Sequence, residues 1–211
     1  MPGLFGTRGE VKGLGTFSFQ DCPEGVKHKF PFSYVQHNRI PQDEVRQVYE
    51  GMEIATHGFR HEPLGAVSED EMRASVDADK TALEKIFGTT VVGHAYAQGS
   101  TSPAAQAYLK AQGYQYARAV FPSGGFAFPE DPMNFRPSSS LILKNAVKLV
   151  ERFKCEEPGE KDLLLFLWAH SYEMDYDKGN ASWYALERLF ESIAGRSDIV
   201  YCTNSEAFAH I

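Results

Sequence analysis

Apolar segments of strand length alternate along the chain with longer stretches in which apolar residues recur every three or four positions. The first pattern is typical of buried β-strands and the second of amphipathic helices. The predicted strands are 14–19, 52–56, 91–96, 114–120, 134–138, 163–168 and 199–202. The predicted helices are 41–51, 68–88, 102–113, 141–153, 180–194 and a C-terminal helix from Thr203. Strict alternation indicates right-handed βαβ units and therefore an α/β fold with a parallel sheet.

Capping residues mark the ends of the longest predicted helix. Ser68 is followed three residues later by Glu71, the spacing of a capping box, and Gly88 stands where the apolar periodicity stops. Thr203 and Glu206 repeat the capping-box spacing before the last helix. The pattern leaves an open sheet and a closed barrel as alternatives, but both place their chemistry at the carboxyl ends of the strands.

Composition narrows the class of protein. With 211 residues the chain can form one domain with a substantial core. A formal net charge of −7 argues against nucleic-acid binding, which needs a basic face. No apolar stretch approaches the roughly 18 to 20 residues that span a bilayer, and the N-terminus has no apolar signal segment. Cys22, Cys155 and Cys202 are far apart. We therefore expect a cytoplasmic protein with reduced thiols that binds neither nucleic acid nor membranes.

Histidines follow two of the predicted strands. His57 and His61 come directly after strand 52–56, and His170 comes directly after strand 163–168. If the turn between His57 and His61 is helical, both imidazoles lie on one face and can bind one ion. Neutral imidazole is a good ligand for zinc and related divalent metals. The spacing alone favours two solvated loop histidines over a metal site, so it predicts a metal site only together with further signals.

Several segments resemble the motifs of polysaccharide deacetylases of the NodB-homology type. Residues 49–61 are similar to the second motif of that family, in which a small residue follows the first His and another His stands four positions on. Residues 166–173 are similar to the last motif, a strand that ends in a His. Residues 93–99 resemble the third motif, and Thr16-Phe17 and Tyr116-Ala117-Arg118 also match family segments.

This resemblance implies one domain over residues 1–211 with a distorted (β/α)7-type barrel and metal-dependent hydrolase activity. The reaction would remove N- or O-linked acetyl groups from a carbohydrate or a related small amide. His57 and His61 would bind a divalent metal, with zinc the expected ion, and His170 would be the general acid. The residues assigned to substrate binding are Tyr96, Trp168, Glu173 and Arg118.

Two departures from the family pattern affect this interpretation. The first motif, two adjacent Asp residues that supply the third metal ligand and the general base, should lie about twenty residues before Thr16, where the chain has only fifteen residues and no Asp. We therefore expect an N-terminally truncated domain that lacks the first strand. The third motif usually reads Ala-Tyr-Pro-Tyr-Gly, but Ala97 and Gln98 replace its Pro and second Tyr.

Three explanations of the missing Asp pair are open. In the first, the protein begins upstream of Met1. In the second, the chain is a catalytically inactive relative that binds a ligand or partner. In the third, a local carboxylate substitutes for the missing Asp pair. Asp21, which follows strand 14–19, is the first choice as catalytic carboxylate, with Glu173 and Asp175 as further candidates. A deaminating or ring-opening hydrolase on the same scaffold is a further alternative. A missing first strand would leave an open sheet edge, which predicts a homo-oligomer.

Overall fold

The computed structural model describes residues 16–17, 26–30, 33–37, 40, 42–157, 159 and 161–209. Four short parallel strands form the main sheet in the order β1–β4–β5–β6. Their bounds are Thr16–Phe17 (β1), Ala55–Thr56 (β4), Gly93–Ala95 (β5) and Tyr116–Arg118 (β6). Because the four strands run in the same direction, their carboxyl ends share one edge of the sheet.

Parallel pairing continues beyond β6. Phe135 forms a parallel bridge with Arg118, and the amide of Ser138 donates a hydrogen bond to the carbonyl of Phe166. Two further strands then pair in parallel, β7 (Ser139–Ser140) and β8 (Leu167–Trp168). The single α/β domain with a distorted (β/α) barrel that the sequence predicts is therefore confirmed.

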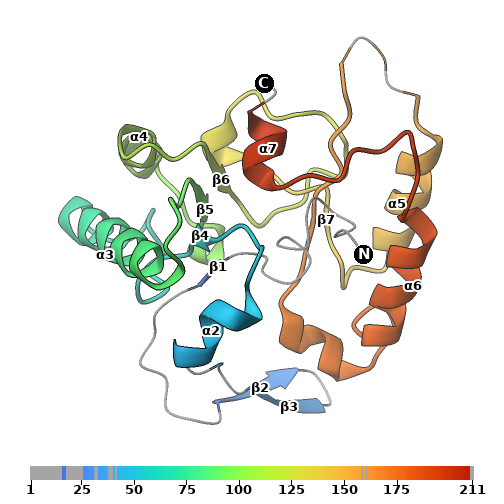
Figure 1. The fold of residues 1–211 in the computed structure, drawn as a ribbon, viewed down its shortest axis with the longest axis horizontal. Coiled ribbons are helices and arrows are strands. Elements are labelled where there is room, and N and C mark those ends of the chain that lie inside the picture. The colour runs from blue at the N-terminus through green and yellow to red at the C-terminus, as the bar shows by residue number, and fades with distance from the viewer. Residues whose placement is uncertain are drawn as a thin grey trace.

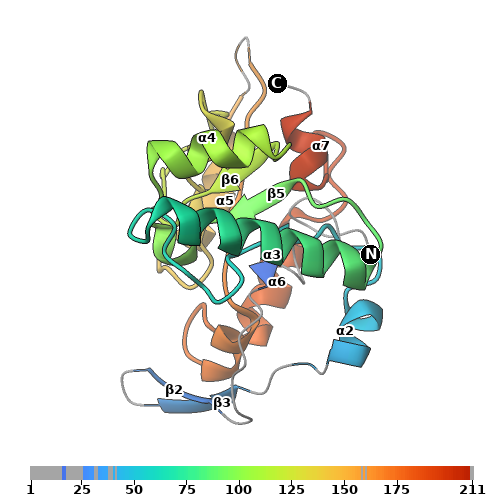
Figure 2. The same cartoon turned by 90° about the vertical axis from the view of Figure 1, so that its left-hand side faces the viewer.

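Helices pack against both the main sheet and the β7–β8 pair. The α-helices are α2 (Gln42–Val48), α3 (Glu69–Phe87), α4 (Pro103–Ala111), α5 (Ala146–Cys155), α6 (Trp183–Ile193) and α7 (Asn204–Phe208). Short 3₁₀ helices are η1 (Ala97–Gly99), η2 (Pro132–Asn134) and η3 (Ser171–Tyr176). Figures 1 and 2 show α3 and α4 side by side against the main sheet, with α5 and α6 on the opposite side of the molecule.

The largest core cluster lies between the main sheet and helices α3 and α4. Met72, Val76 and Leu83 from α3 and Leu109 from α4 are almost completely buried in it. Spacings of three and four residues put the α3 residues on one helix face, so the apolar periodicity of the sequence is the cause of this packing. Both ends of α3 are capped as predicted, because the Ser68–Glu71 capping box forms and Gly88 adopts the left-handed conformation.

Helix α7 covers the amino ends of the strands. Phe208 stacks on Tyr116 with ring centroids 5.3 Å apart. Glu53, which precedes β4, accepts hydrogen bonds from the Tyr116 hydroxyl at 3.0 Å and from the Ser205 amide at 3.1 Å. Burial raises the pKa of Glu53 above its ordinary value, although these hydrogen bonds oppose the shift. With the amino ends covered in this way, the carboxyl ends are the side available for chemistry.

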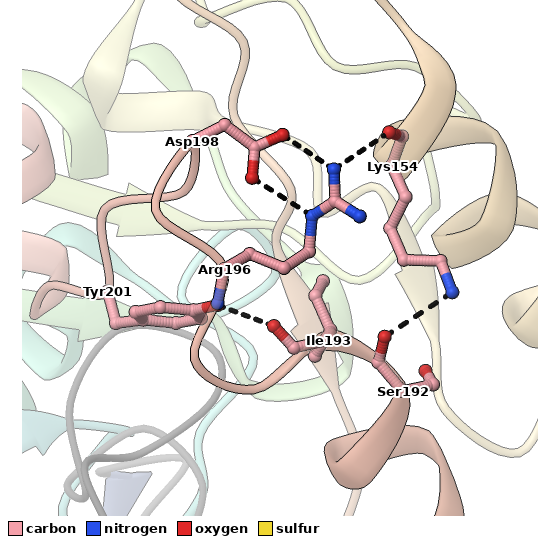
Figure 3. Close-up of polar contacts among 6 residues, drawn as sticks. All are labelled: Lys154, Ser192, Ile193, Arg196, Asp198 and Tyr201. Atoms are coloured by element: carbon pink, nitrogen blue, oxygen red, sulfur yellow. Dashed lines mark hydrogen bonds and ion pairs between the residues drawn. The ribbon is translucent and has the colours of Figure 1, made fainter.

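The predicted strand 199–202 is wrong. These residues form no ladder; Ile199 and Tyr201 pack against the apolar cluster of α5 and α6, whereas Val200 is 84% exposed. The Tyr201 hydroxyl donates to the carbonyl of Ile193, and Arg196 ties the same region to α5 (Figure 3). One-sided burial of an irregular segment therefore produced the alternating pattern that usually indicates a strand.

Other boundaries also differ from the prediction. Helix α5 begins at Ala146 rather than 141, because residues 141–145 form turns, including one closed by a hydrogen bond from the Leu143 amide to the Ser140 carbonyl. The strands are shorter than their apolar segments. An antiparallel hairpin, β2 (Val26–Phe30) and β3 (Ser33–His37), was not predicted. Within the described residues, no helix has the length and apolar character needed to cross a membrane.

Candidate active site

The carboxyl ends of four strands bring polar side chains to one edge of the sheet. His57 follows β4, Arg118 ends β6 and Trp168 ends β8. His94 is the middle residue of β5, and His170 lies two residues beyond Trp168. Parallel pairing is the reason that residues more than one hundred positions apart in the sequence meet here.

A tight turn brings His57 and His61 together. The His61 amide donates to the Gly58 carbonyl at 3.0 Å, which closes a four-residue turn, and the two imidazole centroids lie 4.7 Å apart with an interplanar angle of 78°. His61 and Gly58 both have positive φ angles, 62° and 83°. The intervening residues are thus a turn instead of the helical segment that the spacing argument required, and the rings still meet.

Helix α3 holds this turn through its backbone. Asp79 accepts a hydrogen bond from the His57 amide at 2.8 Å and another from the Gly58 amide. Ser75, one helical turn earlier, accepts from the Phe59 amide at 3.0 Å and donates to Glu62 at 2.7 Å. The turn that carries both histidines is therefore fixed by side chains from a different element.

Asp79 is an unusual helix residue because it is completely buried. Its Oδ1 atom has no hydrogen-bond partner among the described residues, although Oδ2 accepts from His57. Burial raises the pKa of Asp79 to about 7, and the backbone amides of His57 and Gly58 oppose that rise. Ser75 and Asp79 were not predicted; the signal was two polar residues four positions apart on the apolar face that contains Met72 and Val76.

The ring of His57 is oriented by the neighbouring strand. Its Nδ1 atom lies 2.7 Å from the carbonyl oxygen of Ala95, so Nδ1 carries the proton and donates it. This arrangement leaves Nε2 with its lone pair free, and it is the second-sphere contact that metal-ligating histidines usually make. Burial is the main cause that lowers the pKa of His57 to about 3, and the charges of His61, Arg118 and His170 act in the same direction.

The donor set fits part of a divalent metal site. The imidazoles of His57 and His61 lie beside one another, and the Ala95 carbonyl fixes the tautomer of His57. Within the described residues, however, no group of three or more His, Cys, Asp or Glu side chains surrounds a single point. Asp21, the sequence-based choice for a catalytic carboxylate, lies outside the described residues.

His94 lies behind the two histidines and was not among the predicted site residues. It is fully buried, and its Nδ1 lies 2.7 Å from the Thr56 hydroxyl. Within the described part of the chain, its Nε2 has no partner. The Thr56 hydroxyl also lies 3.1 Å from the hydroxyl of Tyr114. Burial lowers the pKa of His94 well below its ordinary value, with the charges of His57 and Arg118 acting in the same direction, so this cluster is neutral.

Arg118 and Trp168 pack against one another. The guanidinium carbon lies 4.7 Å from the centroid of the indole ring, and Arg118 is only 6% exposed. Its Nη1 donates to the carbonyl of Ala119 at 3.1 Å. Burial lowers the pKa of Arg118 to about 10, so the side chain stays charged at neutral pH. The Trp168 Nε1 atom is buried, and no described residue accepts a hydrogen bond from it.

His170 is the most accessible of the site histidines, with 46% of its side chain exposed. Glu173 lies 3.2 Å from its Nδ1 atom and accepts a hydrogen bond from its amide at 2.7 Å. The indole of Trp168 lies beside the imidazole, with centroids 5.4 Å apart. Glu173 therefore faces His170 and positions it, while Asp175 accepts a hydrogen bond from Trp183.

Two further predicted features lie deeper in the fold. Tyr96 is completely buried in the main core cluster, and its hydroxyl donates to the carbonyl of Met133 at 2.7 Å. In the third-motif segment, Gln98 has a positive φ angle of 57° inside η1. The structure thus brings His57, His61, Arg118, Trp168, His170 and Glu173 to one edge and places the ring of Tyr96 in the core behind them.

Known structures share this fold. One is a Pseudomonas aeruginosa PAO1 protein that is described as a probable polysaccharide deacetylase. Its TM-score is 0.58 at 18% identity, and the match covers 80% of this chain. The Puue allantoinase gives 0.57 at 17% identity over 80% of this chain, and a Mycobacterium smegmatis protein described as a polysaccharide deacetylase gives 0.56 at 18% over 81%. The chain spans 62%, 62% and 66% of these three proteins, respectively.

Sequence comparison points to the same group. No curated protein matches the chain. The family model for polysaccharide deacetylases matches residues 26–117, the stretch that contains β4, β5, the His57–His61 turn and helix α3. This match and the fold shared with the solved structures agree with one another: over residues 26–117 the chain is similar to polysaccharide deacetylases.

Proposed function

We propose that this chain is a metal-dependent hydrolase that removes N- or O-linked acetyl groups from a carbohydrate or a related small amide. The observation that carries the proposal is the pair of imidazoles, His57 and His61, at the carboxyl edge of the sheet with ring centroids 4.7 Å apart. His57 donates its Nδ1 proton to Ala95, which leaves its other nitrogen for a metal.

A divalent ion, with zinc the expected one, would be held by His57 and His61. Asp21, which lies outside the described residues, is the candidate catalytic carboxylate within this sequence. Bound there, the ion would supply Lewis-acid polarisation of the acyl oxygen and lower the pKa of a water molecule. His57 and His61 have no other role in the proposal than to bind the ion in a fixed geometry.

His170 is proposed to donate a proton to the leaving amine or alkoxide. Its half-exposed ring lies at the same edge as His57, and its charge acts on the pKa of His57. Glu173 hydrogen-bonds the His170 amide and lies beside Nδ1, so the opposite ring nitrogen is directed away from that carboxylate. A histidine has an ordinary pKa near neutrality and can exchange protons under these conditions.

The experiment is a measurement of metal content in three purified proteins: wild type, His57→Ala and His170→Asn. We expect about one equivalent of zinc or a similar ion in wild type and in His170→Asn, and little in His57→Ala. Release of acetate from acetylated sugars would then be assayed on the loaded proteins. Absence of metal from wild type after addition of excess zinc would contradict the proposal.

The second candidate is a catalytically inactive binding domain on the same fold. The observation that favours it is the third-motif segment, where Ala97 and Gln98 stand and the backbone of Gln98 is left-handed. A change at this position alters the backbone that would face an oxyanion. Metal binding without any acetate release from wild type would favour this candidate over the hydrolase.

A further inference from the structure

Arg118 is a buried charge, and none of the described residues places an opposite charge beside it. Only 6% of the residue is exposed, and its hydrogen bond is to the carbonyl of the adjacent Ala119. Within the part of the chain that the structure describes, no carboxylate lies within ion-pair distance of its guanidinium. A buried guanidinium without an anion is unfavourable, because desolvation of the charge is not offset by a partner.

A second unsatisfied donor lies next to this charge. The indole Nε1 of Trp168 is buried and has no acceptor among the residues that the structure describes, and the face of the same ring lies 4.7 Å from the Arg118 guanidinium carbon. The contact between the cation and the ring stabilises the guanidinium through the ring face. It does not provide an acceptor for the in-plane N–H groups of Arg118 or for the indole N–H.

These donors lie within the candidate active site. Arg118 is close enough to His57 for its charge to act on the His57 pKa, and Trp168 contacts His170 with centroids 5.4 Å apart. Arg118 is therefore a neighbour of the proposed metal ligand, and Trp168 is a neighbour of the proposed proton donor. His170 is 46% exposed, so a ligand that contacts its ring lies beside Trp168.

We propose that the substrate of this site carries a carboxylate, such as that of an acidic sugar, and that Arg118 binds it with the indole N–H of Trp168 as the second donor. The planar guanidinium matches a planar carboxylate through two parallel hydrogen bonds. One positive charge balances one negative charge, and the formal net charge of −7 on the chain disfavours more highly charged anions. The inference rests on the proposed function, since it specifies the substrate of that same site.

The test measures binding and does not require hydrolysis. Wild-type protein treated with EDTA is heated with glucuronate, with the uncharged methyl ester of glucuronate, or with acetate, at equal ionic strength. We expect glucuronate to raise Tm by about 3 to 6 °C at ~10 times its Kd, whereas the ester and acetate at the same concentration give no comparable shift. Because the protein is free of metal, failure of this test is distinguishable from failure of the proposed reaction.

Three variants separate recognition from stability. Arg118→Met keeps the length of the side chain without the charge, so it should abolish the shift while the Tm without ligand stays equal to that of wild type or rises. Arg118→Lys keeps the charge without the planar guanidinium and should show a smaller Tm shift with glucuronate. If Arg118→Met does not fold, Arg118→Lys is used in its place. Arg136→Met is the matched control, because Arg136 is exposed and also donates to backbone carbonyls.

The outcomes divide clearly. A shift with glucuronate that is lost in Arg118→Met and kept in Arg136→Met supports the proposal. An equal shift with acetate overturns it, because the site would then bind the released acyl product instead of an acidic substrate. A lower ligand-free Tm of Arg118→Met together with no shift in wild type also overturns it, since Arg118 would then have a structural role.

Discussion

Two histidines at the same edge of the sheet are held in different ways. His57 is bound through its amide to Asp79 on α3 and through its ring to the Ala95 carbonyl of β5, so its contacts come from other elements. His170 is bound through its amide and its ring by Glu173, three residues further along the same segment, and its side chain is 46% exposed. The first arrangement suits a ligand that must stay fixed, and the second suits a group that exchanges protons with solvent.

Among the variants that test the different roles of His57 and His170, His170→Asn is expected to have the largest effect. If His170 is the proton donor, its loss should lower kcat for acetate release by about 10²–10⁴-fold, while metal content stays unchanged. Steady-state kinetics and metal analysis on the same preparation check this. Loss of metal in His170→Asn would contradict the division of roles, because the exposed histidine would then be a ligand.

The next effect concerns the buried support of His57. Asp79→Ala leaves the amides of His57 and Gly58 without their acceptor, so we expect about 2 to 4 kcal/mol less free energy of unfolding and ~10–100-fold weaker metal binding. Urea denaturation and zinc titration measure the two quantities. Asp77→Ala is the control, because Asp77 lies on the same helix but is exposed and contacts the Tyr108 hydroxyl; its cost should stay below about 1 kcal/mol.

A smaller effect is expected at the turn itself. Gly58 has a φ angle of 83°, and a Cβ atom there would lie 3.1 Å from the Glu62 amide nitrogen. Gly58→Ala should lower the free energy of unfolding by about 1–2 kcal/mol and weaken metal binding, since the imidazoles shift apart. Gly124→Ala introduces the same backbone strain at a φ angle of 70° with nothing within 4 Å of the added atom. If both variants bind metal alike, the turn does not set the ring geometry.

The smallest effect lies at the opposite end of the strands. Burial raises the pKa of Glu53, so the folded protein keeps this proton to a higher pH than the unfolded chain. Stability should therefore fall as the pH rises from the ordinary value of 4.5 through the raised folded-state value. Glu53→Gln should flatten that part of the curve without any change in metal binding. Urea denaturation across this pH range checks the slope; an unchanged slope in the variant would assign it to another group.

For the His57–His61 pair, the sequence predicted the contact but not the backbone conformation that produces it. The strand before His57 and the family resemblance predicted that His57 and His61 meet, and they do. The reason given was a helical turn, whereas a tight turn with positive φ at Gly58 and His61 achieves the contact. Spacing along the chain limits which residues can meet, but several backbone conformations satisfy the same limit.

Helix ends were predicted more accurately than strands. The capping boxes at Ser68 and Thr203 form as expected, because each is made by residues three positions apart. The prediction of strand 199–202 was wrong, because strand pairing depends on a neighbour that the local pattern does not contain. A segment that is apolar on one side can pack through Ile199 and Tyr201 without forming a ladder. The Ser75–Asp79 support of the His57–His61 turn was missed for a similar reason, since its partners are backbone amides of another element.

By itself, the sequence determined the α/β class, the caps and apolar face of α3, and the strand-end positions of His57 and His170, because these depend on residues that are near one another in the chain. Only the tertiary structure decided that Asp79 anchors the His57 amide and that Arg118 lies against Trp168 without a described carboxylate beside it. Burial and the identity of a neighbour set the energy of a charged group, and both are properties of the packed chain.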